Sequence, residues 1–396
     1  MRRPAALDKE SAKLSGICAV ATKNGRKDAK SGGQTLLAHL VASGYKRAEP
    51  PILQPAAVFL DQLGEDMRGR LYLTTDAAGA ELCLRPEFTL PVSVAYLASN
   101  AAGKAAAFSY LGSVFRFRPD GSGEFLQAGL ESFGRKDKDA ADAEILALAL
   151  EAAAKAGRDD LSVTIGDAGL FAQFLDSLKL PASWLRLIRR GLAHGVSLEK
   201  IFEASPTNGS DDHSGVLAAL EGADKQGARA LVEDLLSIAG ISSVGGRSVS
   251  EITERFLEQA SLRSGPGVPQ DKRDLIAKFL GVSGDPDAAS ATLRKLASDA
   301  KLDLSAALDS FDQRLNFMVA RGLDPASMKF SARFVRRLDY YTGFVFEAHA
   351  PDAAPDKPVI GGGRYDRLLG TLGAKKDIPA VGAAIWVERL FAEVSA

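Results

Sequence analysis

The chain has 396 residues, of which 46% are hydrophobic and 25% are charged. This length allows two or three domains with a substantial core, and the composition is that of an ordinary globular protein. The formal net charge of −1 excludes a strong overall attraction to nucleic acid or anionic membranes, although a local basic patch is compatible with it.

Cysteine content and apolar runs predict the compartment. Cys18 and Cys83 are too few for a disulfide framework, which favours a reducing cytosol. The run LSGICAVA near the N-terminus is short and follows lysines and acidic residues, which argues against a signal peptide. No run of the sequence approaches the roughly 18 apolar residues of a membrane helix. We expect a soluble, cytoplasmic protein with no membrane partner.

The first elements alternate between helix and strand. A helix is predicted over about residues 34–43, followed by a short strand that ends near Pro55. From Leu71 the pattern is rich in β-formers, and after the turn DAAGAE a strand passes into a helix.

A long antiparallel hairpin is predicted next, because RPDGSGE separates two strand-like runs and Pro-Asp-Gly is typical of a tight turn. Alternate residues of a strand share a face. Gln127 and Glu131 therefore point the same way from the second strand, and Arg116 and Arg118 do so from the first. These polar groups are either a solvated rim or the lining of a site. The helix predicted after the hairpin ends at Gly157.

From about Leu161 to Phe330 the pattern favours amphipathic helices, with one possible strand at LSVTI. A stripe at helical spacing near the end of this region is interpreted as core-facing, and it comprises Leu304, Leu308, Phe311, Leu315 and Met318. Strand character then returns. Strands at both ends with helices between them predict one antiparallel sheet interrupted by a helical insertion.

Further polar clusters lie on strands of the same expected sheet. They are Glu87 and Thr89, which share a face if their segment is extended, then Arg336, Tyr340 and Tyr341, and finally Arg364 and Tyr365. GGGRYD has no Walker lysine, so a phosphate loop is not predicted. The four histidines lack metal-ligand spacing and there is no C-x-x-C, so we expect no metal and no other cofactor.

Several of these segments resemble the histidyl-tRNA synthetase family. VRRLDYYTGFVFE and IGGGRYDRLLGTLG resemble its two histidine-specific signatures. LRPEFT, VFRF…FLQAGLESFG and AVGAAIWVERL resemble the strand before motif 2, motif 2 itself and motif 3 of the class II synthetase core, and GYKRAEPPILQP is similar to motif 1. The resemblance covers about residues 1–158 and 328–396. It implies an α+β fold, a class II aminoacyl-tRNA synthetase-like antiparallel sheet flanked by helices, with a mainly helical domain over 159–327.

The resemblance also implies a site for free histidine, with separate groups for its ammonium, its carboxylate and its ring. By matching position these are Glu87, Thr89 and Gln127 for the ammonium, Arg116 and Arg336 for the carboxylate, and Glu131, Tyr341 and Tyr365 for the imidazole, with Tyr340 shaping the pocket. An amino acid needs an anionic patch, a cationic patch and a group that recognises its side chain, and this set provides all three.

The sequence departs from the synthetase pattern where ATP would bind. Arg116 is followed after one residue by Arg118, where motif 2 usually has a glutamate, and the hairpin loop has no arginine. Ala384 and Trp386 stand at the glycine positions of motif 3. An indole has a large apolar surface, on the order of 200 Å². Trp386 is expected either to occupy the space of the adenine or to pack in the core. Arg336 and Arg389 are kept, so two cationic groups remain that could bind ATP.

The end of the chain differs as well, because synthetases continue past motif 3 into an anticodon-binding domain. We expect no anticodon-binding domain and no tRNA partner. The sequence is then similar to the regulatory subunit family of ATP phosphoribosyltransferase, which acts in the first step of histidine biosynthesis. This resemblance implies no catalysis by the chain itself, histidine feedback, a homodimer through the synthetase-like core, and a hetero-octamer with short-form catalytic subunits. The alternative is a ligase that forms histidyl-adenylate for a non-tRNA acceptor.

Overall fold

The computed structural model describes residues 23–60, 62, 65–119, 121–193, 195–203, 267–334, 340–351, 353–354 and 356–391, with single positions between 230 and 262. Arg336 of the predicted site and Cys18 lie outside these residues. The chain forms two compact units, Met1–Phe171 with Gly281–Ala396, and Ala172–Leu280. The second unit is shorter than the helical domain predicted over 159–327, because a strand at its start and two helices at its end belong to the first unit.

Within the described residues, the first unit is built on a nine-stranded sheet. In spatial order its strands are β1 (Lys46–Arg47), β5 (Ala106–Phe115), β6 (Glu124–Phe133), β14 (Ala380–Trp386), β13 (Ile360–Arg364), β12 (Phe344–His349), β7 (Ser162–Asp167), β11 (Lys329–Ser331) and β10 (Ser283–Gly284). The pairs from β5 to β7 are all antiparallel, which confirms the predicted sheet, whereas β1 and β11 join their neighbours in parallel.

Strands from the two ends of the sequence meet at the centre of this sheet. β5 and β6 form the predicted hairpin, which pairs from Phe115 with Glu124 to Ala106 with Phe133. β14 then pairs with β6, so that Trp386 lies opposite Gln127. This pairing brings the segments that resemble motifs 2 and 3 into adjacent strands.

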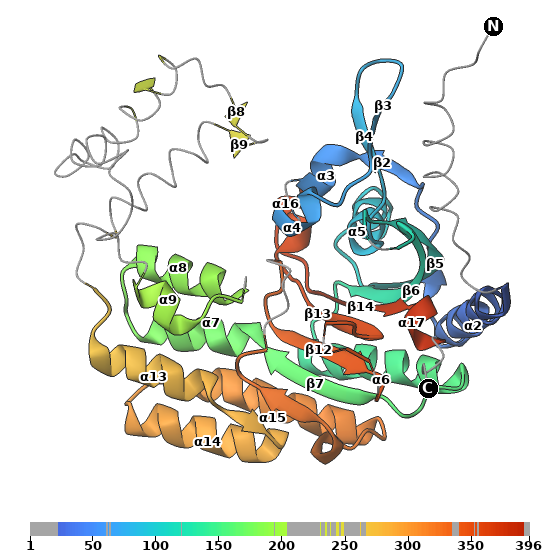
Figure 1. Ribbon diagram of the computed structural model, residues 1–396. Coiled ribbons are helices and arrows are strands. Elements are labelled where there is room, and N and C mark those ends of the chain that lie inside the picture. Colours follow the sequence, from blue (N-terminus) through green and yellow to red (C-terminus); the bar gives the residue numbers. More distant parts are fainter. Residues whose placement is uncertain are drawn as a thin grey trace, which may run out of the picture. The chain divides into compact units, whose positions relative to one another are not determined.

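Helices cover one side of the sheet (Figure 1). α6 (Lys138–Lys155) packs against β6, β13 and β14, and both α2 (Lys23–Ala42) and α15 (Ser305–Ala320) pack against α6. α14 (Pro286–Asp299) packs on α15. The apolar stripe predicted on α15 is buried, as expected. Gly157, two residues past α6, has a φ of +94°, which suits a glycine that ends a helix.

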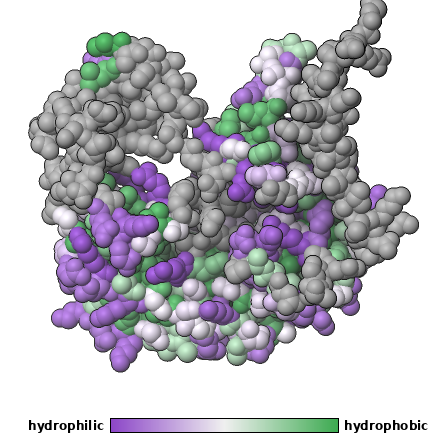
Figure 2. Space-filling model, in the orientation of Figure 1, coloured by the Kyte–Doolittle hydropathy of each residue, from purple (hydrophilic) through white to green (hydrophobic). Residues whose placement is uncertain are grey.

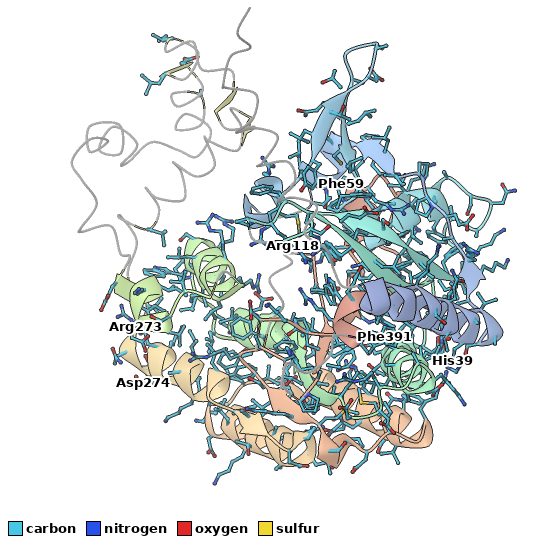
Figure 3. All side chains as sticks on the ribbon, turned by 45° about the vertical axis from the view of Figure 1, so that its right-hand side comes forward. His39, Phe59, Arg118, Arg273, Asp274 and Phe391 are labelled. Carbon is cyan, nitrogen blue, oxygen red and sulfur yellow. The ribbon has the colours of Figure 1, made fainter. Side chains whose placement is uncertain are left out.

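The C-terminal helix α17 (Val387–Leu390) packs against α2. The next residue, Phe391, places its ring on Gly32 of α2, where a Cβ would lie 1.9 Å from the ring (Figure 3). A side chain at Gly32 would therefore displace this contact.

Smaller elements form a second layer of the first unit. β2 (Leu53–Pro55), β4 (Glu81–Leu84) and β3 (Leu73–Thr75) make a three-stranded sheet, accompanied by α3 (Ala56–Leu60), α4 (Glu65–Arg68), α5 (Thr89–Leu97) and α16 (Leu368–Thr371). The 3-10 turn η2 (Pro325–Ser327) packs instead against α14 and α15. Aromatic and aliphatic side chains of this layer form a core cluster with β5 and β6 that includes Phe59, Phe88, Tyr110, Tyr365 and Trp386.

The second unit contains α8 (Ala182–Ala193), α9 (Leu198–Glu203), α13 (Gln270–Leu280) and a short hairpin of β8 (Ser243–Val244) and β9 (Arg247–Ser248), and most of α7 (Ala168–Ser177). Phe174 stacks on Phe279 with ring centres 4.1 Å apart. Arg186 and Arg190 are exposed on α8, where the surface is strongly hydrophilic (Figure 2). None of the helices in the described part of the chain is long and apolar enough to cross a membrane.

Candidate functional site

A cavity of about 560 Å³ lies on the side of the central sheet opposite α6. Seven of the nine predicted site residues line it, namely Glu87, Thr89, Arg116, Gln127, Tyr340, Tyr341 and Tyr365. Glu131 contacts two of these through hydrogen bonds, and Arg336 lies outside the described residues. The structure thus brings the described members of the predicted set to one place.

The first acidic group, Glu87, lies at the start of α5. Its carboxylate accepts hydrogen bonds from the backbone N–H of Thr89 at 2.7 Å and of Leu90 at 2.8 Å. Burial raises the pKa of Glu87, while these N–H groups and Arg116 oppose the shift. The condition for Glu87 and Thr89 to share a strand face, an extended segment, is not met, because Thr89 begins a helix whose free N–H groups need an acceptor.

Glu131 is the deepest polar group of the site and is fully buried in β6. It accepts hydrogen bonds from the Thr89 hydroxyl at 2.8 Å and from the Tyr365 hydroxyl. Burial raises the pKa of Glu131 to about 8. Burial also raises the pKa of Tyr365 well above its ordinary value, so this phenol stays neutral and donates.

Arg116 supplies a half-buried cation at the other end of the hairpin strands. Its Nε donates to the carbonyl of Pro86 at 2.7 Å, and its guanidinium lies 5.5 Å from the centre of the Phe125 ring. Burial lowers the pKa of Arg116 to about 10, against the opposing charge of Glu87. It therefore remains charged at neutral pH. The guanidinium of Arg118, a residue labelled in Figure 3, lies 4.1 Å from the centre of the same phenyl ring.

Gln127 carries an unsatisfied acceptor. Its side chain is 1% exposed, and its Oε1 finds no hydrogen-bond donor among the described residues. A buried carbonyl oxygen without a donor costs on the order of 1–3 kcal/mol. Because Gln127 lines the cavity, a ligand with an N–H group would remove this cost.

Three tyrosines form a wall of the cavity. The ring of Tyr340 lies 4.9 Å from that of Tyr341 and 5.7 Å from that of Tyr365. The wall is held from behind by Thr342, whose backbone N–H donates to the carbonyl of Arg364 at 2.8 Å and whose hydroxyl accepts from the N–H of Asp366 at 3.0 Å.

Arg364 is a sequence candidate that the structure removes from the site. Its side chain lies on the α6 side, where it pairs with Asp142 at 2.6 Å and with Asp366 at 2.8 Å. Asp142 also pairs with Arg314 of α15 at 3.0 Å, and Arg314 reaches Asp167 at 2.8 Å. Tyr365 follows Arg364 directly and faces the cavity, as expected for adjacent residues at the end of a strand.

Sequence reasoning missed several lining residues. Glu347 is the one charged residue of β12, and strand pairing places it in a row with Gly361, Ala384 and Gly129. A lone charge in an apolar strand was the signal available for it. Arg70, Asp356 and Arg389 also line the cavity. Trp386, expected either at the site or in the core, lines the cavity and belongs to the core cluster.

Within the described part of the chain, no group of three or more His, Cys, Asp or Glu side chains is placed to hold a metal ion.

Comparison with known proteins gives the family. The family model for histidyl-tRNA synthetase matches residues 26–226 and 225–390. An ATP phosphoribosyltransferase regulatory subunit of Brucella anthropi is 42% identical over 346 residues, covering 86% of this chain and 91% of the relative. A protein of the same name from Brucella canis is 41% identical over 360 residues, covering 90% and 95%. The chain belongs to the family of ATP phosphoribosyltransferase regulatory subunits.

Solved structures agree with this fold. An ATP phosphoribosyltransferase regulatory subunit/histidyl-tRNA synthetase of Bacillus halodurans gives a TM-score of 0.65 at 21% identity, covering 95% of this chain and 81% of the other. A histidine–tRNA ligase subunit of Alicyclobacillus acidocaldarius gives 0.58 at 23% identity, covering 99% and 96%. The synthetase-like fold predicted from the sequence is confirmed.

Proposed function

We propose that this chain is a non-catalytic regulatory subunit that binds free histidine in the cavity and controls a partner ATP phosphoribosyltransferase. Family membership supports the regulatory role. The arrangement of charges supports the ligand, since the cavity offers hydrogen-bond acceptors, a half-buried cation and an aromatic wall.

The observation that carries the ligand proposal is the unsatisfied Oε1 of Gln127, which lines the same cavity as Glu87 and Arg116. The ammonium group of an amino acid supplies the missing donors, with Glu87 as its counter-charge. The carboxylate then faces Arg116, and the imidazole reaches Glu131 and Tyr365. Arg336 is proposed as a second partner of the carboxylate.

The regulatory mechanism is a linkage between sites. If histidine binds the inactive assembly more tightly than the active one, it shifts the population toward the inactive assembly. The ratio of its affinities for the two assemblies sets the limit of this shift. In this proposal the catalytic partner is a short-form subunit that joins the chain in a hetero-octamer, with a homodimer formed through the synthetase-like core. In this proposal the chain supplies no catalytic group, acts in the cytoplasm and binds no tRNA.

The test is reconstitution with the short-form catalytic subunit. We expect the two proteins to co-purify, the phosphoribosyltransferase rate to rise when the chain is added, and histidine to lower it again. Gln127→Met, which keeps the side-chain length and removes the acceptor, is expected to retain stimulation and weaken inhibition by histidine. A rate that is the same with and without the chain would refute the regulatory role.

One observation favours the alternative ligase, namely that Arg389 lines the cavity together with Arg116 and adds a second cation for an anionic ligand. Histidine-dependent exchange of pyrophosphate into ATP by the purified chain decides this. We expect none, and measurable exchange would favour the ligase.

A further inference from the structure

The side chains that line the cavity from β14 increase in size along the strand. On β14 the residues Gly382, Ala384 and Trp386 alternate on the face that lines the cavity, opposite Glu131, Gly129 and Gln127 of β6. Along this strand the side chain is a hydrogen atom at Gly382, a methyl group at Ala384 and an indole at Trp386.

At the Gly382 end, strand β14 carries no side chain, and the neighbouring Glu131 carboxylate requires this. A Cβ built on Gly382 would lie 1.6 Å from the Glu131 carboxylate, so this position admits only glycine unless Glu131 moves. The space above Gly382 is thus filled by the Glu131 carboxylate, one of the groups that recognise the ligand ring in the proposed function.

At the other end of the strand, Trp386 is held in place by several contacts. Trp386 is 7% exposed, and its backbone N–H donates to the carbonyl of Val359 at 2.9 Å. The guanidinium of Arg389 lies 5.0 Å from the indole, and its Nη1 donates to the carbonyl of Pro358 at 2.7 Å. A cation held against an indole by its own hydrogen bond fixes the position of both.

The indole stands at the cationic end of the site. Burial first, and then the nearby charges of Arg118 and Arg389, lower the pKa of Arg116, which places these guanidinium groups in one electrostatic neighbourhood. Arg116 also lies over the ring of Phe125, two residues before Gln127, the pairing partner of Trp386. Arg116 and Trp386 both line the cavity, so a ligand carboxyl group held by Arg116 shares that cavity with the indole.

We propose that Trp386 determines specificity by limiting the site to amino acids with a free carboxylate, because the indole occupies the space into which a bulky carboxyl substituent would extend. The proposal rests on the proposed histidine site. Esters, aryl amides and peptides of histidine are then rejected by size in addition to their missing charge. Such a wall suits a sensor of the free amino acid.

The experiment measures calorimetric affinities of wild type and Trp386→Ala for L-histidine, L-histidinamide and L-histidine β-naphthylamide. Histidinamide lacks the charge and stays small, so the ratio between the two amides isolates size. We expect wild type to bind the naphthylamide at least about ten-fold more weakly than histidinamide, and Trp386→Ala to remove this difference. Trp386→Phe, which keeps an aromatic wall, is expected to lie between them and serves if the alanine variant is unstable.

Trp184→Phe is the matched control, since it changes the other tryptophan of the chain, in the second unit. It is expected to leave all three affinities unchanged. Equal binding of both amides by wild type, or the same ratio in wild type and the Trp386 variants, overturns the role of Trp386 even if histidine binds. Folded wild type that binds none of the three ligands overturns the histidine site itself and the wall with it.

Discussion

The two faces of the central sheet use buried charge in different ways. On the α6 side, Arg314 and Arg364 are 4% and 5% exposed, and each contacts at least two aspartates within 3.0 Å. On the cavity side, the Gln127 acceptor has no donor within the described residues, and Arg116 makes its hydrogen bond to a carbonyl.

This difference separates structural from binding groups. A buried ion pair with its partners in place joins elements of the fold, since removing one partner leaves an uncompensated charge. A buried polar group that lacks a partner is costly unless a ligand completes it. Similar residue types therefore predict a loss of stability on one face of the sheet and a loss of affinity on the other.

The largest expected effect comes from Arg314→Met. It leaves Asp167 and Asp142 buried with fewer counter-charges, which is expected to lower the free energy of unfolding by about 3–5 kcal/mol in denaturant titrations. Arg294→Met is the control, because Arg294 pairs with Asp309 and Asp312 at the surface and should cost less than about 1 kcal/mol. Equal costs for both variants would contradict the distinction between the two kinds of pair.

On the cavity side, Gln127→Met is expected to lower the affinity for histidine and not the stability of the fold. Loss of an acceptor for a charged donor is expected to weaken histidine binding by about 10- to 100-fold. The free energy of unfolding without ligand should stay the same or rise, because the unsatisfied oxygen is gone. Calorimetric titration and denaturant unfolding on the same samples measure the two quantities. A stability loss with unchanged affinity would place Gln127 among the structural groups.

Stability should depend on pH through Glu131. Its pKa rises from the ordinary 4.5 to about 8 on folding, so between these values the folded chain keeps a proton that the unfolded chain has lost. The free energy of unfolding without ligand therefore falls as pH rises through this window, by up to about 1.4 kcal/mol per pH unit from this group. Glu131→Gln should flatten the profile in thermal or denaturant unfolding. An identical profile in the variant would show that other groups cause it.

The smallest effect is expected from Tyr365→Phe. It removes one hydrogen bond to Glu131, which is expected to weaken histidine binding by about five- to ten-fold. Tyr45→Phe provides a comparison, because Tyr45 donates to Glu144 on α6 at 3.0 Å and should leave the affinity unchanged. Competition binding with labelled histidine resolves differences of this size.

Sequence periodicity correctly predicted the features that depend on local backbone geometry, such as the hairpin and the faces of its strands. The Pro-Asp-Gly turn and strand alternation correctly placed Gln127 and Glu131 on one face of a hairpin. Strand alternation does not apply at Thr89, where the carboxylate of Glu87 satisfies the first N–H groups of a helix. It also could not tell Arg364 from the site residues, because its partner Asp142 is distant in sequence. Assignment of the cavity residues to a histidine ligand came from the family resemblance, not from the pattern.

The most direct test of the histidine site is a calorimetric titration of the purified chain with L-histidine, with Gln127→Met as the matched variant. We predict saturable binding by wild type and a much weaker interaction with the variant at equal stability. Folded wild-type protein that gives no binding heat and no thermal shift at millimolar histidine would contradict the proposed site.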